Sequence, residues 1–137
     1  MEWRKDNYLI TDDRTRMDIG AIHALLDATY WAAGRSLAAV EKSVANSLCF
    51  GLFHEQKQVG FARVVTDGAV FAWLCDVVLE QSHRNRGVGS WMMEAVLEHP
   101  ALQSTEIVLR TNGSESLYAR RGFSPCDSRL TWMNLKR

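Results

Sequence analysis

Apolar positions in the first third of the chain recur with the period of an α-helix, in two separate stripes. The residues of the two stripes are Ile19, Ile22, His23, Leu25 and Leu26, then Leu37, Val40, Val44 and Leu48. Asp18 and Ser36 stand directly before them, and such side chains accept hydrogen bonds from the free amides of a first helical turn. The pattern predicts two helices that begin after Asp18 and Ser36, with a break at residues 30–35.

The middle of the chain changes to apolar runs that are typical of β-strands. A short candidate covers residues 8–11, and three longer ones cover 48–54, 59–66 and 70–79. A polar turn separates the first two long runs, and Asp67-Gly68 is a strong turn signal before the third. We therefore expect an antiparallel meander of the three long strands, with residues 8–11 as an edge strand.

The last third of the chain predicts a return to helix and then short alternating elements. A core-facing helical stripe consists of Val88, Trp91, Met92, Ala95 and Val96. Pro100 ends this helix, and a strand at 106–110, a short helix at 114–120 and a last strand at 129–135 are expected after it. The order strand, helix, strand implies a parallel, right-handed crossover. The fold class is therefore mixed α/β (α+β), a single domain over residues 1–137 with about four helices.

Length and composition limit the classes of protein to be considered. A chain of 137 residues, 47% of them hydrophobic, can bury one good core. Basic and acidic residues number 16 each, which indicates neither a nucleic acid nor a membrane surface as partner. The sequence shows no apolar signal core and no run near the ~18 residues of a membrane span, so we expect a cytoplasmic protein. The three cysteines are expected to be free thiols, and the histidines lack metal-ligand spacing, so no metal is expected.

The clearest candidate site is the basic glycine turn over residues 84–89, Arg-Asn-Arg-Gly-Val-Gly, between the apolar run 70–79 and the amphipathic helix. Amides at a helix start lack partners, the helix dipole adds positive charge there, and glycines let a ligand approach the backbone. Ser90-Trp91 excludes a P-loop ending, and Met92 replaces the last glycine of a dinucleotide fingerprint. Local chemistry leaves two readings, a pyrophosphate cradle or a plain connection between strand and helix.

A second motif, Ser116-Leu-Tyr-Ala-Arg-Arg-Gly-Phe123, follows downstream. Together the two segments resemble the GNAT superfamily of acyl-CoA-dependent N-acetyltransferases, with its Arg/Gln-x-x-Gly-x-Gly/Ala pyrophosphate loop and its Leu-Tyr-x-x-x-Gly-Phe motif. Residues 71–79 are similar to the family's central strand, and the resemblance is clear over 59–123. The chain departs from the family at Gln81, where a proline is usual, and at Thr111, where an asparagine is frequent.

The resemblance implies acetyl-CoA as co-substrate and a parallel strand pair that splays around it. The backbone of Val77, Val78 and Leu79 would then bind the pantetheine arm. The pyrophosphate would lie against the residues of the turn, which are Arg84, Asn85, Arg86, Gly87, Val88, Gly89 and Ser90. Tyr118 falls on the motif tyrosine, the usual candidate acid for the leaving thiolate, and with an ordinary pKa of about 10 it is protonated at pH 7. The alternative for Tyr118 is a ring that only packs on the core.

Three further residues are candidates for the acceptor side of the site. Asp76 lies inside the most apolar strand, where a carboxylate is costly unless it is paired. It is either a general base or binder of a cationic amine, or a structural carboxylate at a bulge or beside an arginine. Trp31 and Arg35 lie at the break between the first two helices, where they either wall an amine site or plug the helix pair.

The expected activity is transfer of an acetyl group from acetyl-CoA to a primary amine of a small molecule, by direct attack in a ternary complex. Two alternatives stay open: a non-catalytic acyl-CoA-binding or sensor domain on the same scaffold, and a protein acetyltransferase that acts on lysine or an N-terminus. A homodimer is compatible with the sequence.

Overall fold

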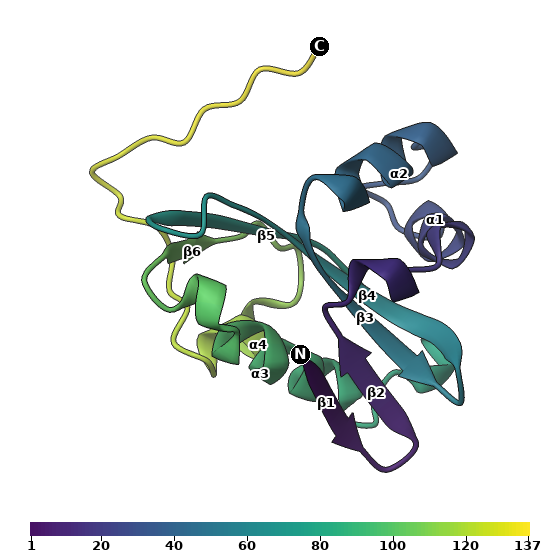
Figure 1. The fold of residues 1–137 in the computed structure, drawn as a ribbon. Coiled ribbons are helices and arrows are strands. Elements are labelled where there is room, and N and C mark those ends of the chain that lie inside the picture. Colours follow the sequence, from purple (N-terminus) through teal and green to yellow (C-terminus); the bar gives the residue numbers. More distant parts are fainter.

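A computed structural model describes all 137 residues as a six-stranded mixed sheet with α-helices on both faces (Figure 1). The strands are β1 (Glu2–Lys5), β2 (Tyr8–Thr11), β3 (Leu48–His54), β4 (Lys57–Thr66), β5 (Phe71–Leu79) and β6 (Glu106–Val108). The helices are α1 (Ile19–Asp27), α2 (Leu37–Ala45), α3 (Val88–Glu98) and α4 (Glu115–Ala119). Strands follow their chain order in the sheet; β1 to β5 are antiparallel, and β5 and β6 are parallel. The mixed sheet with four helices expected from the sequence is confirmed.

The starts of α1 and α2 are fixed by the two side chains that the sequence singles out. The carboxylate of Asp18 accepts a hydrogen bond from the Ala21 amide at 3.0 Å, and the hydroxyl of Ser36 accepts one from the Ala39 amide at 3.1 Å. Each bond satisfies one of the amides that the first helical turn leaves free. The loop between the two helices carries Trp31 and Arg35 toward the sheet.

Two apolar clusters, one on each face of the sheet, form the core. One joins strands β2 to β5 to α3 and includes Phe50 and Ala62, whereas the other joins the sheet to α1 and α2 and includes Cys49 and Phe61. Neighbouring residues of a strand therefore serve opposite faces, as the period of two requires. Figure 1 shows α1 and α2 on one side of the sheet, with α3 and α4 on the other.

A β-bulge in β5 interrupts this alternation at Asp76. Arg63 pairs with Cys75 and Phe61 with Val78, so two residues of β5 lie opposite one residue of β4. Asp76 has φ +50°, a left-handed conformation that is uncommon for a residue other than glycine. Before the bulge Leu74 packs on the α3 side, and after it Val77 does so. The bulge therefore turns the Asp76 side chain toward the loop between α1 and α2.

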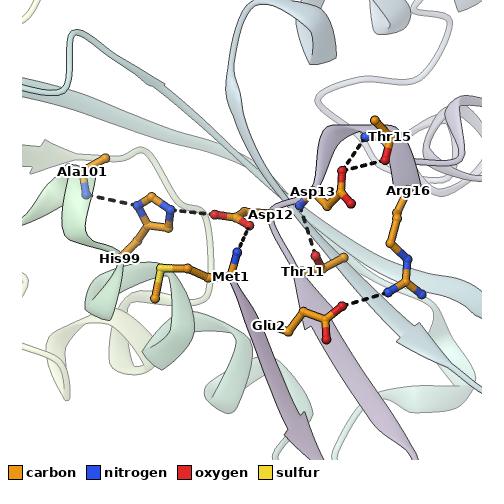
Figure 2. A network of polar contacts seen from close by, with 9 residues as sticks. All are labelled: Met1, Glu2, Thr11, Asp12, Asp13, Thr15, Arg16, His99 and Ala101. Atoms are coloured by element: carbon orange, nitrogen blue, oxygen red, sulfur yellow. Dashed lines mark hydrogen bonds and ion pairs between the residues drawn. The ribbon is translucent and has the colours of Figure 1, made fainter.

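A part-buried hydrogen bond between Asp12 and His99 joins the N-terminal hairpin to the end of α3 (Figure 2). Asp12 follows β2, and its carboxylate lies 2.9 Å from Nε2 of His99, while its other oxygen accepts a hydrogen bond from the α-amino group of Met1. Burial alone would raise the pKa of Asp12, but the hydrogen bonds and charges of these two partners hold it below its ordinary value. The other side of the His99 ring accepts a hydrogen bond from the Ala101 amide, which fixes its orientation.

Two expectations at the ends of the chain are wrong. Residues 8–11 are not an edge strand, because Glu2–Lys5 forms an additional strand that pairs with them. Residues 129–135 form no strand; they extend away from the body as coil, and within this single chain no strand pairs with them (Figure 1). The strand after α3 is also shorter than expected and ends at Val108. All three cysteines are free thiols, as expected, and no helix is long and apolar enough to cross a membrane.

Candidate active site

The parallel strands β5 and β6 pair over only three residues and then separate. The paired residues are Phe71–Trp73 and Glu106–Val108. Beyond them, residues 74–77 of β5 and residues 109–112 after β6 line opposite sides of a cavity of about 350 Å³. Backbone groups on this stretch of β5 are free to bind a ligand, because the neighbouring parallel strand no longer reaches them. The splay implied by the sequence resemblance is therefore present.

The glycine turn lies beyond the end of β5 and opens α3. Gly87 precedes the helix with φ +76°, and no side chain caps the helix. The amides of Val88, Gly89 and Ser90 occupy the first helical turn, where the helix offers them no acceptor. A Cβ added at Gly87 would meet no atom within 4 Å, so the space beside the backbone is open. These residues fit an anionic group such as a pyrophosphate.

The side chains of the turn differ in whether another residue of the chain holds them by a hydrogen bond. Arg84 donates through Nε to the carbonyl of Leu79 at 3.0 Å, which ties the turn to the end of β5. Asn85 and Arg86 are exposed, and Asn85 has φ +62°. The hydroxyl of Ser90 accepts a hydrogen bond from Arg121, so this residue offers a ligand its backbone amide rather than its side chain.

Tyr118 lies on α4 and lines the cavity between the separated strands. Its ring packs on the α3-side core and meets Phe123 edge-on, with ring centroids 5.8 Å apart. No residue of the chain hydrogen-bonds to the phenol. Burial raises the pKa of Tyr118 above its ordinary value, so the phenol stays protonated and can donate.

Arg121 holds α4 against α3 and was not singled out by sequence reasoning. Its guanidinium donates to the carbonyl of Ser90 at 3.1 Å, to the carboxylate of Glu94 at 3.3 Å, and to the carbonyl of Leu117 at 3.2 Å. The helix that carries Tyr118 is thereby fixed to the helix that begins at the glycine turn. The pair Arg120-Arg121 inside the motif is visible in the sequence, but nothing there indicates which of the two points inward.

Asp76 is a buried carboxylate held by three donors. Its side chain is 2% exposed; one oxygen accepts from the indole of Trp31 at 3.2 Å, and the other accepts from Arg35 and Arg63, each at 2.8 Å. Burial would raise the pKa of Asp76, but the hydrogen bonds and charges of the two arginines outweigh it and lower the pKa. Of the two alternatives that the sequence leaves open, this geometry favours the carboxylate paired with arginine.

The structure brings four of the candidate residues together in one cavity. Trp31, Asp76, Val77 and Tyr118 all line the cavity. Arg35 does not line the cavity; it donates a hydrogen bond to Asp76, which does. Tyr30, which forms an aromatic pair with Trp31 at the break between the first two helices, also lines the cavity. The other residues of the wall had no assigned role from the sequence; they are Leu74, Cys75, Leu109, Arg110, Thr111, Asn112 and Ser114. For Arg110, Thr111, Asn112 and Ser114 the sequence gave one indication of a functional position, a polar stretch that follows a strand.

A central strand that separates from its parallel neighbour, with a glycine turn and a helix start beyond its end, is the arrangement that the resemblance to acyl-CoA-dependent N-acetyltransferases implies. The family profile described as "Acetyltransferase (GNAT) domain" matches residues 45–125. The chain belongs to the GNAT family of acetyltransferases, so the family expected from the sequence is confirmed.

Relatives of known sequence or structure agree with this assignment. The Gibberella zeae protein FG08082, provisionally named as an acetyltransferase, is 30% identical in an alignment that covers 70% of this chain and 66% of that protein. The chain thus spans just under two thirds of that relative. A GNAT-family crystal structure from Xanthomonas campestris pv. campestris is 39% identical, with TM-score 0.89 and 96% of each chain covered. A Mycobacterium tuberculosis structure in complex with CoA, 20% identical with TM-score 0.67, covers 86% of this chain and 72% of its own and shares the fold.

Proposed function

We propose that the chain transfers the acetyl group of acetyl-CoA to a primary amine of a small molecule, by direct attack in a ternary complex. The observation that carries the proposal is the cavity between the separated strands β5 and β6, which Tyr118 and Asp76 both line. Such a site brings two substrates into attack geometry, which lowers the barrier of a reaction between two molecules.

The cofactor side of the proposed site consists of β5 and the turn. The backbone of Val77, Val78 and Leu79 would bind the pantetheine arm, while the Val78 side chain is buried in the core on the α1–α2 face. The pyrophosphate would lie against the amides of residues 87–90, with Arg84, Asn85 and Arg86 around them. CoA complexed with a protein of the same fold supports this role for the scaffold.

The chemistry needs few groups from the protein. The amine forms a C–N bond with the acetyl carbon, the C–S bond breaks, and the electron pair leaves on sulfur. Tyr118 would give its phenolic proton to this thiolate, the excess proton of the new ammonium would leave through water to solvent, and the tyrosinate would regain a proton from solvent. Asp76 is not the base in this arrangement, because a carboxylate bound by two guanidinium groups is a poor proton acceptor near neutral pH.

Asp76, Trp31 and Arg35 would instead shape the acceptor side. The carboxylate fixes the indole of Trp31 and the guanidinium of Arg35 in the loop between α1 and α2. Trp31 is 44% exposed and contacts Tyr30 edge-on, which gives the cavity an aromatic wall. We propose that this wall receives the apolar part of the amine substrate.

Calorimetry tests the cofactor part of the proposal. Acetyl-CoA and CoA are expected to bind the purified protein, and ATP is expected to bind more weakly because it lacks the pantetheine arm. Good binding of ATP without binding of CoA would contradict it. Binding of CoA without turnover of any amine would favour the non-catalytic acyl-CoA-binding alternative.

A further inference from the structure

The cavity between β5 and β6 is lined by residues from both faces of the sheet. Tyr118 of α4 lines it, and its ring packs on the core of the α3 face. Asp76 lines it as well, and its side chain points toward the loop between α1 and α2. The other charged residue of the wall is Arg110, which follows β6. The charge that the cavity presents to an acceptor therefore depends on Asp76, its partners and Arg110.

Arg110 reaches the cavity on the face of the sheet that carries α1 and α2. Its guanidinium carbon lies 5.3 Å from the centroid of the Trp73 ring. Ala72 and Leu74 belong to the core on the α3 face, so Trp73 between them points to the opposite face. The guanidinium of Arg110 is therefore on the same face as Asp76, which is the proposed acceptor side of the site.

The hydrogen-bond donors of Arg110 are free to bind a ligand. The residue is exposed, and its guanidinium stacks on Trp73 without an acidic or hydrogen-bonding partner in the chain. Stacking uses the flat face of a guanidinium and leaves the five N–H groups at its edge available. Those groups form a planar fork that matches a carboxylate through two parallel hydrogen bonds. Beside it on the wall, the polar side chains of Thr111, Asn112 and Ser114 can add further hydrogen bonds.

The charges around the acceptor side are positive on balance. The Asp76 carboxylate is bound by Arg35 and Arg63, each at 2.8 Å, so these three groups together carry an excess positive charge. Arg110 adds a second positive charge, and Asp76 is the one acidic residue of the cavity wall. A substrate whose only charge is an ammonium group would be repelled here, whereas a carboxylate would be attracted. The same positive charge favours the neutral form of an amine, which is the form that attacks the thioester.

We propose that the acceptor is an amino carboxylic acid and that Arg110 binds its carboxylate. This inference rests on the proposed acetyl transfer and names the class of its acceptor substrate. The aromatic pair Tyr30 and Trp31 on the same wall would receive the apolar part of the amino acid. Binding of the carboxylate by Arg110 would hold the amine of the same molecule inside the cavity that Tyr118 lines.

Acetyl-CoA turnover with matched pairs of acceptors tests the proposal on the wild-type protein. The pairs are leucine, methionine and phenylalanine, each with its carboxamide, and O-phosphoethanolamine with ethanolamine. The amino acids are expected to exceed their carboxamides in kcat/KM by at least about tenfold, because the carboxamide lacks the charge that Arg110 binds. Carboxamides turned over as well as the acids, or turnover confined to amines without a carboxylate, would overturn the proposal, O-phosphoethanolamine included. No turnover of any amine would contradict the proposed acetyl transfer itself, and this inference with it.

The variant Arg110→Gln assigns the carboxylate to this side chain. It should raise the KM for the amino acid by about ten- to a hundredfold, the range for a lost hydrogen bond to a charged group, and leave kcat/KM for the carboxamide within about twofold of the wild type. Arg4→Gln is the matched control, since it removes the same charge from an exposed side chain on β1, at the opposite end of the sheet, and it should behave like the wild type.

A purely structural role of Arg110 would instead lower kcat/KM for the acid and the carboxamide alike. That result, or an unchanged KM for the amino acid, would overturn the assignment. Thermal unfolding shows whether the variant keeps its fold, and if it does not, the wild-type ratio of acid to carboxamide decides.

Discussion

Tyr118 combines two properties that a proton donor for a thiolate needs. It lines the cavity between β5 and β6, and burial raises its pKa, so it stays protonated well into the alkaline range. We expect Tyr118→Phe to lower kcat by up to the 10²- to 10⁴-fold typical of general acid catalysis, and by less if the CoA thiolate leaves readily without a proton. The KM for acetyl-CoA should change little, because the proton is needed in the transition state and the ring is retained.

The control for this variant is its thermal unfolding, which should match that of the wild type within a few degrees. Steady-state kinetics under conditions where chemistry limits the rate give the result. A kcat equal to that of the wild type would leave Tyr118 as a packing residue beside the cofactor. In the wild type, the alkaline fall of kcat should lie above pH 10, since the native pKa exceeds the ordinary value of about 10.

Asp76 is expected to matter more for stability than for proton transfer. Removing its charge by Asp76→Asn leaves Arg35 and Arg63 close together without their counter-ion. Breaking one partner of a buried ion pair costs about 3–5 kcal/mol, and urea unfolding at pH 7 measures it. If Asp76→Asn is as stable as the wild type but has lost its activity, the Asp76 carboxylate acts as the base.

The pH dependence of the difference in stability between wild type and Asp76→Asn follows from the direction in which the pKa of Asp76 is shifted. The pKa of Asp76 is lowered in the folded chain, so its contribution to stability is present above the ordinary value of about 3.9 and is lost as the pH falls through the lower native pKa. The stability gap between wild type and Asp76→Asn should therefore be constant near neutral pH and shrink below about pH 4. A gap that does not change with pH would show that shape rather than charge separates the two proteins.

At the scale of elements, the junction of β5 and α3 is tested by a matched pair of glycine variants. Gly87 and Gly68 both have a positive φ, of +76° and +69°, and at both a Cβ meets no atom within 4 Å. Aspartate therefore strains the backbone alike at both positions, but only at Gly87 does it place a carboxylate in the proposed pyrophosphate site. Gly87→Asp should weaken CoA binding by at least about tenfold, or ~1.4 kcal/mol, and Gly68→Asp should leave it unchanged. Equal affinities in calorimetry would reject the cradle.

The attachment of α4 to α3 gives a second matched pair, at Arg121 and Arg120. Arg121 bonds to Ser90 and Glu94 of α3, whereas Arg120 bonds only to Ser116 of its own helix. Arg121→Leu should lower the free energy of unfolding by about 1–3 kcal/mol and reduce kcat by displacing Tyr118, because it removes the charged hydrogen bonds that connect α4 to Ser90 and Glu94. Arg120→Leu should stay within about 0.5 kcal/mol of the wild type. Similar losses in both variants would contradict the positioning role.

Most elements were predictable because their signals are local. Asp18 and Ser36 cap their helices as residue type and position suggest, and the apolar stripe from Val88 to Val96 faces the core. The bulge at Asp76 was foreseen as one of several ways to accommodate a buried carboxylate. The choice of Arg35 and Arg63 as partners depends on a loop and a neighbouring strand, and the sequence carries no signal for such contacts.

At the scale of the whole molecule, residues 129–135 show that a strand-like sequence does not by itself add a strand to a sheet. Residues 129–135 have strand composition, but within one chain the structure leaves them unpaired and exposed. A strand forms only beside a partner edge, and the free edge of the sheet is that of β6. Residues 129–135 do not pair with it, and the bond between Asp127 and Arg129 is local. The cavity wall after β6 is likewise a product of tertiary structure, since residues 109–112 line one cavity with Trp31 only in the folded chain.

The most direct test of the account is turnover of acetyl-CoA with a panel of amines, amino acids, aminoglycosides and peptides, with free CoA thiol as the readout. We expect thiol release that requires a small-molecule primary amine and that falls in Tyr118→Phe while CoA binding persists. Thiol release with peptides alone would move the acceptor to proteins. No amine-dependent release from a protein that binds CoA would contradict catalysis by this site.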